Sequence, residues 1–156
     1  MPAGTSRSPG DDTDGGSMSA LPPRLVLFDG DCAVCDASVR FLLDRDRAGR
    51  LHFAPLQGPT AARIRARHPE WPADLDSLVY VEQTEHGERL NWYSSGILRM
   101  LGALPAPWRW LSALQVLPRV LRDPPYRAFA AIRLQVFGTV DACRLPTEAE
   151  AARLLA

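Results

Sequence analysis

The sequence contains no lysine, and all 18 of its basic residues are arginine. This absence excludes every mechanism that needs a lysine side chain. Acidic residues also number 18, so the formal net charge is zero and gives no general attraction to nucleic acid or to an acidic membrane. The sequence also lacks any stretch approaching about 18 uninterrupted apolar residues, so it predicts no membrane span.

Cysteine is scarce as well. Three cysteines in 156 residues are too few for the disulfide framework of a small secreted protein. Residues 1–23 consist largely of glycine, serine, proline and aspartate and lack the apolar core of a signal peptide. We expect them to form a disordered tail, and we expect the protein to be cytoplasmic. With 46% apolar residues, the rest of the chain can form one domain with its own core.

Two of the cysteines, Cys32 and Cys35, lie where a predicted strand gives way to a predicted helix. Residues 25–28 form a short apolar run typical of a buried strand, and the Asp-Gly-Asp sequence at 29–31 is typical of a turn. Both thiols then lie on the first turn of a helix, where unpaired N–H groups and a partial positive charge favour a thiolate. We expect Cys32 to be the more exposed thiol and the nucleophile, and Cys35 to resolve a mixed disulfide.

The order of the predicted elements is that of a thioredoxin-like α/β domain. A helix between the first two strands indicates a right-handed parallel β-α-β unit, and residues 85–87 are a hairpin signal. The pattern predicts a β-α-β-α-β-β-α core with strands at 24–28, 51–56, 77–83 and 89–93 and helices at 32–47, 59–67 and 94–104. A helical extension follows from about residue 105, with helices at 107–122 and 124–136, and a short last helix within 147–156.

From Phe28 to Cys35 the sequence resembles the DCC family of predicted thiol–disulfide oxidoreductases, named for its Asp-Cys-x-x-Cys signature. The resemblance covers residues 24–146, which we treat as one domain, and includes segments 92–96, 118–123, 126–138 and 143–146. It implies a thioredoxin-like fold and a redox dithiol. By position, Cys32 and Cys35 take the redox roles of the family, and Asp29 and Asp31 are its signature acids.

These observations predict a thiol–disulfide oxidoreductase that exchanges electrons with a protein or small-molecule disulfide. No bound cofactor is expected, only an external electron donor or acceptor. The alternative is a binding or adaptor domain without turnover, because one feature of thioredoxins is missing: they place a cis-proline directly before the third strand, facing the cysteines. Here Asp76 and Ser77 occupy that place, so either the peptide groove differs or the partner is not an extended peptide.

The two aspartates admit several roles. Asp29 is expected to accept or relay a proton from Cys35, while in the alternative Asp29 or Asp31 caps the helix. An Asp-x-Asp pair after a strand also occurs in haloacid-dehalogenase-type phosphatases, but the absence of lysine argues against that interpretation. A metal site would need about four ligands, drawn from Cys32, Cys35, Cys143 and one of His52, His68 or His86. Their spacing does not favour such a site, so we expect Cys143 to be a packed cysteine.

The extension carries a run of large apolar residues whose role the sequence leaves open. Trp108, Trp110, Leu111 and Leu114 are expected to pack on the sheet as core, with an exposed lipid-binding or partner-binding face as the alternative. In the following helix, Phe129, Ile132 and Val136 recur at helical spacing. Tyr126, Arg127 and Arg133 match family positions, and we assign them no catalytic role.

Overall fold

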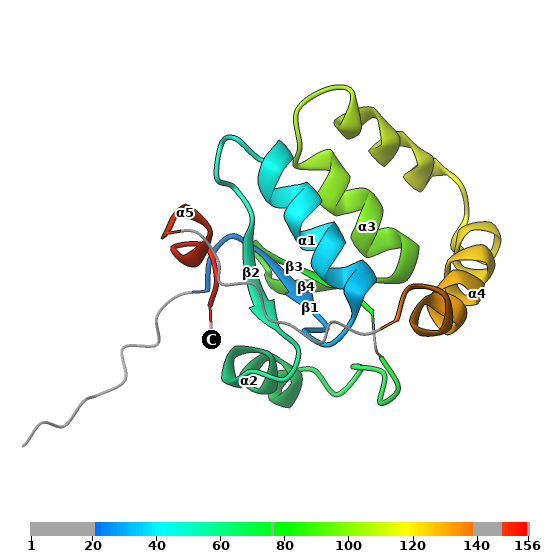
Figure 1. Ribbon diagram of the computed structural model, residues 1–156, viewed down its shortest axis with the longest axis horizontal. Coiled ribbons are helices and arrows are strands. Elements are labelled where there is room, and N and C mark those ends of the chain that lie inside the picture. The colour runs from blue at the N-terminus through cyan, green and yellow to red at the C-terminus, as the bar shows by residue number, and fades with distance from the viewer. Residues whose placement is uncertain (1–20, 76, 139–147, 156) are drawn as a thin grey trace, which may run out of the picture.

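The computed structural model describes residues 21–75, 77–138 and 148–155, and its centre is a four-stranded sheet in the order β2-β1-β3-β4 (Figure 1). β1 and β2 are parallel, β3 is antiparallel to β1, and β4 forms a hairpin with β3. This topology confirms the predicted thioredoxin-like α/β fold. The strands are β1 (Arg24–Phe28), β2 (His52–Pro55), β3 (Val79–Thr84) and β4 (Gly87–Trp92).

Helices cover both faces of this sheet, with α1 and α3 on one face and α2 on the other (Figure 1). Successive side chains of β1 point to opposite faces of the sheet, as in any β-strand. Val26 packs in a cluster with residues of α1 and α3, whereas Leu25 and Leu27 pack with Ala61 and Ile64 of α2. The helices are α1 (Ala33–Arg45), α2 (Pro59–Arg67), α3 (Tyr93–Gly102), the 3-10 helix η1 (Trp108–Val116), α4 (Arg119–Phe137) and α5 (Glu148–Ala151).

The helical extension differs from the prediction in its boundaries. The expected helix 107–122 is the 3-10 helix η1, and α4 begins before the prolines rather than at them. Pro124 and Pro125 lie inside α4 and leave the carbonyl groups of Val120 and Leu121 without an intrahelical donor. Because Val120 and Leu121 are exposed, water can satisfy these carbonyls, so the helix continues.

Gly96 allows α3 to pack closely against the end of β4. A Cβ atom at this position would lie 2.6 Å from the carbonyl oxygen of Asn91, which is too close for any other residue without movement of the backbone. The helix begins at Tyr93 with Trp92 in the cap position. The helix therefore begins one residue before the predicted start at 94, and the Ser94 hydroxyl donates a hydrogen bond to the carboxylate of Asp123.

The C-terminal residues attach to the free edge of β2. Phe53 donates its N–H to the carbonyl of Arg153 at 2.9 Å and accepts from the N–H of Leu155 at 2.7 Å. The Arg153 guanidinium also forms an ion pair with Asp46, whose side chain is 1% exposed. Within the predicted segment 147–156, the helix is therefore short and gives way to a parallel bridge with the sheet. None of the helices in the described ranges is long and apolar enough to cross a membrane.

Two parts of the sequence prediction fall on residues outside this description. Most of the expected disordered tail 1–23 lies before Leu21, and Cys143 lies in the segment 139–147. The division into a tail, a domain at 24–146 and a terminal helix stays a prediction.

Candidate dithiol site

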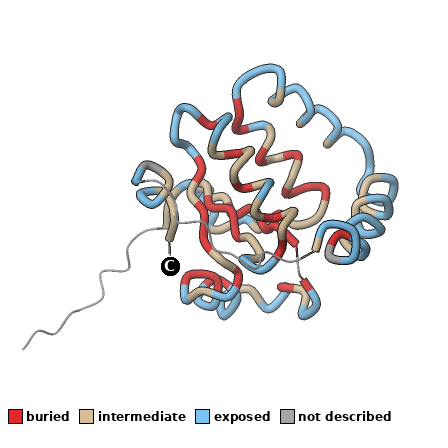
Figure 2. The backbone as a smooth tube through the Cα atoms, viewed as in Figure 1, coloured by how far each residue is buried: buried red, intermediate tan, exposed pale blue. Residues whose placement is uncertain are grey.

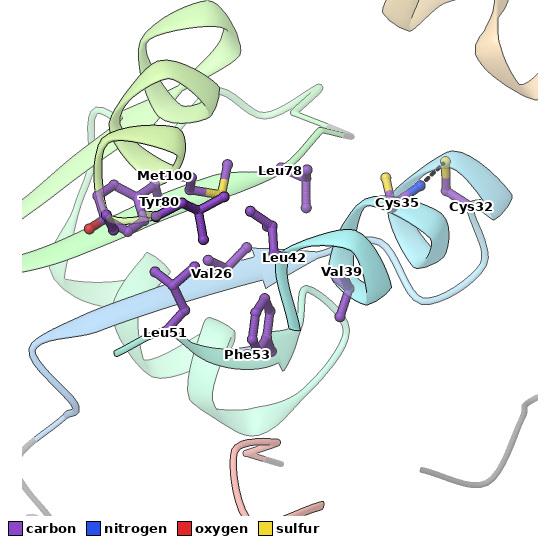
Figure 3. Packing of buried hydrophobic residues seen from close by; sticks show 12 residues of the cluster. Val26, Cys32, Cys35, Val39, Leu42, Leu51, Phe53, Leu78, Tyr80 and Met100 are labelled. Atoms are coloured by element: carbon purple, nitrogen blue, oxygen red, sulfur yellow. Dashed lines mark hydrogen bonds between the residues drawn. The ribbon is translucent and has the colours of Figure 1, made fainter. Parts of the chain in front are cut away.

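Cys32 and Cys35 lie at the junction of β1 and α1, as the sequence predicts. The strand ends at Phe28, and Cys32 follows the turn in an extended conformation as the N-cap residue of α1. The Cys35 N–H, in the first helical turn, donates a hydrogen bond to the Cys32 sulfur at 3.4 Å (Figure 3). Both cysteines are free thiols. The sulfur of Cys32 therefore occupies the place that an oxygen takes in an ordinary N-cap, where N–H groups stabilise negative charge.

The alternative in which Asp29 or Asp31 caps the helix is wrong. The N-cap residue is Cys32. The Asp29 side chain lies in the turn before the helix, where its Oδ1 atom accepts a hydrogen bond from the N–H of Asp31 at 3.1 Å. This contact spans two residues and closes the turn between strand and helix, as aspartate commonly does. Asp29 thus shapes the loop that delivers Cys32 to the helix.

The burial of the two thiols differs from the expectation. Cys32 is 0% exposed and Cys35 is 3% exposed, so Cys32 is not the more accessible sulfur. Its side chain turns back toward the first turn of the helix and packs within the same core cluster as Val39 and Leu78. Reaction of Cys32 with a disulfide therefore requires movement of the groups that cover it.

The pKa values of the site favour a protonated Cys35. The pKa of the Cys35 thiol is raised to about 12, chiefly by burial and then by the hydrogen bond and the charge of Cys32. The positive charge of Arg133 and a backbone hydrogen bond from Asp29 act in the opposite direction. At neutral pH, Cys35 is therefore a thiol that keeps its proton until something removes it.

Arg133 is the functional candidate that the sequence analysis missed. It comes from α4, is 3% exposed, and places its Nη2 atom 4.0 Å from Oδ2 of Asp29. The other carboxylate oxygen of Asp29 accepts a hydrogen bond from the Gln57 side chain at 2.9 Å. A signal was present: Arg133 follows Tyr126 by seven residues, which places both on one face of a helix. Phe129, which recurs with Ile132 and Val136 at helical spacing, lies on that same side and lines the small cavity with Arg133.

An apolar cavity of about 500 Å³ adjoins the motif between α1, α3 and the end of α4. Ala33 and Val34, the two residues between the cysteines, form part of its wall. A smaller cavity of about 60 Å³ shares Val34 and reaches Cys35 and Arg133. The larger cavity has room for an apolar group beside the dithiol, and the Arg133 guanidinium supplies a positive charge at the smaller cavity.

Leu78 stands directly before β3, beside the dithiol, and lines both cavities. The cis peptide bond among the described residues is that of Ala106–Pro107, in the loop before η1. Because β3 begins at Val79 and not at 77 as predicted, the residue directly before the third strand, where thioredoxins have a cis-proline, is Leu78 and not Ser77.

The metal alternative receives no support from the described part of the chain, in which no three His, Cys, Asp or Glu side chains gather as ligands. His68 pairs with two glutamates instead: its Nδ1 atom lies 2.7 Å from a carboxylate oxygen of Glu70, and its Nε2 atom lies 3.0 Å from one of Glu88. Cys143 lies outside the described residues.

The expectation that the aromatic segment packs as core is wrong for most of its members. Trp110, Leu111 and Leu114 are exposed, and Trp110 is 69% exposed. Trp108 alone of the four packs inward, edge-to-face against Phe41 with 4.9 Å between ring centroids. The half-buried residues of η1 are Trp108, Ser112 and Gln115, so Trp108 is the one large apolar side chain of this helix that is turned toward the rest of the protein.

Comparison with known proteins agrees with the geometry of the site. The model of the family described as DCC1-like thiol-disulfide oxidoreductase matches residues 26–139. The chain is 30% identical over 136 residues to "Uncharacterized protein YuxK" of Bacillus subtilis (strain 168), covering 86% of this chain and 96% of that protein. It is 32% identical over 122 residues to "DCC family protein At1g52590, chloroplastic" of Arabidopsis thaliana, covering 78% and 69%. No solved structure matches. These similarities support a general redox role.

Proposed function

Because the chain belongs to the DCC1-like thiol-disulfide oxidoreductase family, we propose that it catalyses thiol–disulfide exchange through Cys32 and Cys35. The observation that carries this proposal is the hydrogen bond from the Cys35 N–H to the Cys32 sulfur at the start of α1. This contact turns a backbone N–H, at the positive end of the helix, toward the sulfur that acts as the nucleophile in this proposal. The raised pKa of Cys35 keeps the second sulfur protonated and in reserve.

The reaction proceeds in two exchanges. The Cys32 thiolate attacks one sulfur of a substrate disulfide, the S–S bond breaks, and the leaving sulfur departs as a thiolate that takes up a proton. Cys35 then loses its proton and attacks the Cys32 sulfur, which releases the second substrate thiol. The substrate gains two electrons and the Cys32–Cys35 pair becomes a disulfide, which an external dithiol reduces again. Run in reverse, the same steps oxidise a partner. We expect this exchange to occur in the cytoplasm.

The substrate class is a disulfide with an apolar group near the attacked sulfur. The cavity beside Ala33 and Val34 provides the volume for that group, and its walls are almost entirely apolar. The buried side chain of Leu78 beside the dithiol also favours an apolar neighbour over the extended backbone of a peptide.

Replacement of Cys35 by serine is expected to trap partners on Cys32. Without the resolving thiol, the first exchange still forms a mixed disulfide, but nothing attacks it from within the protein. The measurement is recovery of Cys32-linked partners by non-reducing electrophoresis and mass spectrometry. The double variant Cys32→Ser/Cys35→Ser is the matched control. If neither variant captures a partner and the wild type shows no dithiol–disulfide interconversion, the proposal fails.

The burial of Cys32 favours one competing function, a thioredoxin-like adaptor domain that binds without turnover. The two functions differ in the same experiment. An adaptor binds its partner equally well with serine at position 32, whereas the oxidoreductase requires the sulfur.

Asp29 is proposed to receive the proton that Cys35 loses in the second exchange. Its backbone hydrogen-bonds Cys35, and its carboxylate is held by Gln57 with Arg133 nearby. We expect Asp29→Asn to slow resolution of a preformed mixed disulfide on Cys32, on the order of tenfold or more, while its formation is unchanged. Stopped-flow kinetics of the two steps test this role, with Asp31→Asn as the control. Equal resolution rates in wild type and Asp29→Asn would exclude it.

Arg133 is proposed as a positioning residue that lowers the pKa of Cys35. Its guanidinium is buried beside the site and opposes the effect of burial on the thiol. Arg133→Met should raise the pKa of Cys35 further, so the resolution step shifts to higher pH, while Arg133→Lys should restore part of the wild-type pH profile. The pH dependence of mixed-disulfide release measures this, with the exposed Arg127→Met as control. An unchanged profile in Arg133→Met would contradict the role.

A further inference from the structure

The exposed large apolar side chains of the described chain all lie in one segment, between Trp110 and Phe137. Figure 2 shows this segment, η1 and α4, as a largely exposed edge of the molecule. Val116 is 89% exposed and Val120 is 81% exposed. Single exposed apolar side chains are common on protein surfaces, but their concentration in one segment is typical of an interaction site. We define the η1–α4 face by six of its exposed apolar members, Trp110, Val116, Val120, Leu121, Ile132 and Val136.

Helix α4 is amphipathic with its polar side inward. On its outer side, an apolar stripe runs at helical spacing through Leu121, Pro125, Ala128, Ile132 and Val136, and each of these residues is exposed. A helix of a water-surrounded domain normally has the opposite arrangement, with its apolar stripe toward the core.

The inner side of α4 is polar and makes specific contacts with the rest of the protein. Asp123 accepts a hydrogen bond from Ser94, and Arg133 lies beside Asp29 at the dithiol. These contacts fix the rotation of the helix. A rotation that buried Leu121 and Ile132 would break the contacts of Arg133 and Asp123, so the apolar stripe stays on the outside.

The charge of this segment is strongly one-sided. Residues 105–137 contain five arginines and a single acidic residue, Asp123, a net charge of +4 in a chain whose total is zero. Arg109, Arg119 and Arg127 are exposed. The segment thus combines apolar and aromatic side chains with peripheral arginines, the composition of helices that lie in the interface of an anionic bilayer.

A second copy of the chain is a poorer occupant of the η1–α4 face. In a symmetric dimer across this face, arginines such as Arg119 and Arg127 of both copies would approach each other. The segment offers Asp123 as its single carboxylate, and Asp123 is already bound to Ser94. The apolar stripes would match, but the charges would repel.

We propose that the η1–α4 face docks the protein on the surface of an anionic lipid bilayer. The apolar residues enter the boundary between headgroups and acyl chains, while the exposed arginines contact anionic headgroups. Because the inner side of α4 faces the dithiol, docking holds the Cys32–Cys35 pair about one helix diameter, roughly 10 Å, from the bilayer. This proposal stands independently of the exchange reaction.

Cosedimentation of the full chain with vesicles tests the proposal. The vesicles consist of phosphatidylcholine alone or of phosphatidylcholine with phosphatidylglycerol. We expect binding to the anionic vesicles, much weaker binding to the neutral ones, and loss of binding at high salt. The variant Trp110→Ser/Val120→Ser/Ile132→Ser should reduce partitioning by at least about tenfold, because each residue is exposed and contributes apolar area only when docked.

Variants that remove arginines provide the second test of vesicle binding. Arg119→Gln/Arg127→Gln should weaken binding to anionic vesicles roughly tenfold or more. The control Arg47→Gln/Arg50→Gln removes two exposed arginines from the α1–β2 loop and should leave binding unchanged. Equal binding to both kinds of vesicle, or equal losses in the two arginine pairs, would overturn the proposal. So would a monomer–dimer equilibrium in sedimentation that the apolar variant abolishes, since that result assigns the face to a second copy.

Discussion

The Cys32→Ser variant is expected to lose disulfide-reductase activity by a factor on the order of 10³ or more, down to the uncatalysed rate. A serine hydroxyl at this position can still accept the Cys35 N–H, so the helix start and the fold should be preserved. The hydroxyl cannot replace a thiolate as the nucleophile toward a disulfide, because it remains protonated. The variant therefore separates the chemistry of the sulfur from its structural role as the cap.

Reduction of insulin by dithiothreitol, followed as precipitation of the released chain, measures this loss. Cys143→Ser is the control, because the third cysteine is expected to take no part in exchange. Circular dichroism and thermal unfolding verify that Cys32→Ser folds. Activity of Cys32→Ser equal to that of the wild type would show that the measured reduction does not pass through this site.

The Arg153→Met variant is expected to lower the free energy of unfolding by about 3 kcal/mol, which corresponds to a fall in Tm of roughly 10 °C. The Asp46 side chain is 1% exposed, and its Oδ2 atom pairs with the Arg153 guanidinium. The same oxygen accepts a hydrogen bond from the Leu51 N–H at 2.7 Å. Removal of the arginine leaves a buried negative charge without its cation. It also removes the hydrogen bond from Arg153 Nε to the carbonyl of Leu51 at 3.0 Å, which helps to hold the C-terminal segment on β2.

Urea unfolding followed by tryptophan fluorescence measures the change in stability. Arg50→Met removes an exposed arginine close to the same strand and serves as the matched control, with an expected change within about 0.5 kcal/mol. If Arg153→Met unfolds at the same urea concentration as Arg50→Met, the ion pair does not fasten the C-terminus to the sheet.

The features that depend on short stretches of sequence could be predicted. The apolar run before Asp29, the turn and the periodic helix after it fix the position of the Cys32–Cys35 pair within a few residues. The order of strands and helices then selects a thioredoxin-like sheet, because a parallel β-α-β unit and a hairpin leave few ways to join four strands. Local pattern and topology agree here, so the fold follows from them.

The features that depend on distant contacts could not be predicted. Arg133 reaches the dithiol from α4, about a hundred residues from Cys35, and the helical spacing of apolar residues in α4 does not identify a distant contact of this kind. The burial of Cys32 likewise depends on tertiary packing and not on its helix-start position. The Asp46–Arg153 ion pair joins positions 107 residues apart, a separation at which periodicity carries no information.

The redox equilibrium of the Cys32–Cys35 pair tests the central claim most directly. The full chain is equilibrated in glutathione buffers of graded potential, its free thiols are alkylated, and mass spectrometry counts the alkyl groups on Cys32 and Cys35. A redox-active dithiol predicts a single two-electron transition, in which both labels are lost together, with a midpoint between about −270 and −120 mV. Two cysteines that stay separately alkylated in every buffer would contradict the account. A disulfide that remains closed below about −300 mV, as structural disulfides do, would also contradict it.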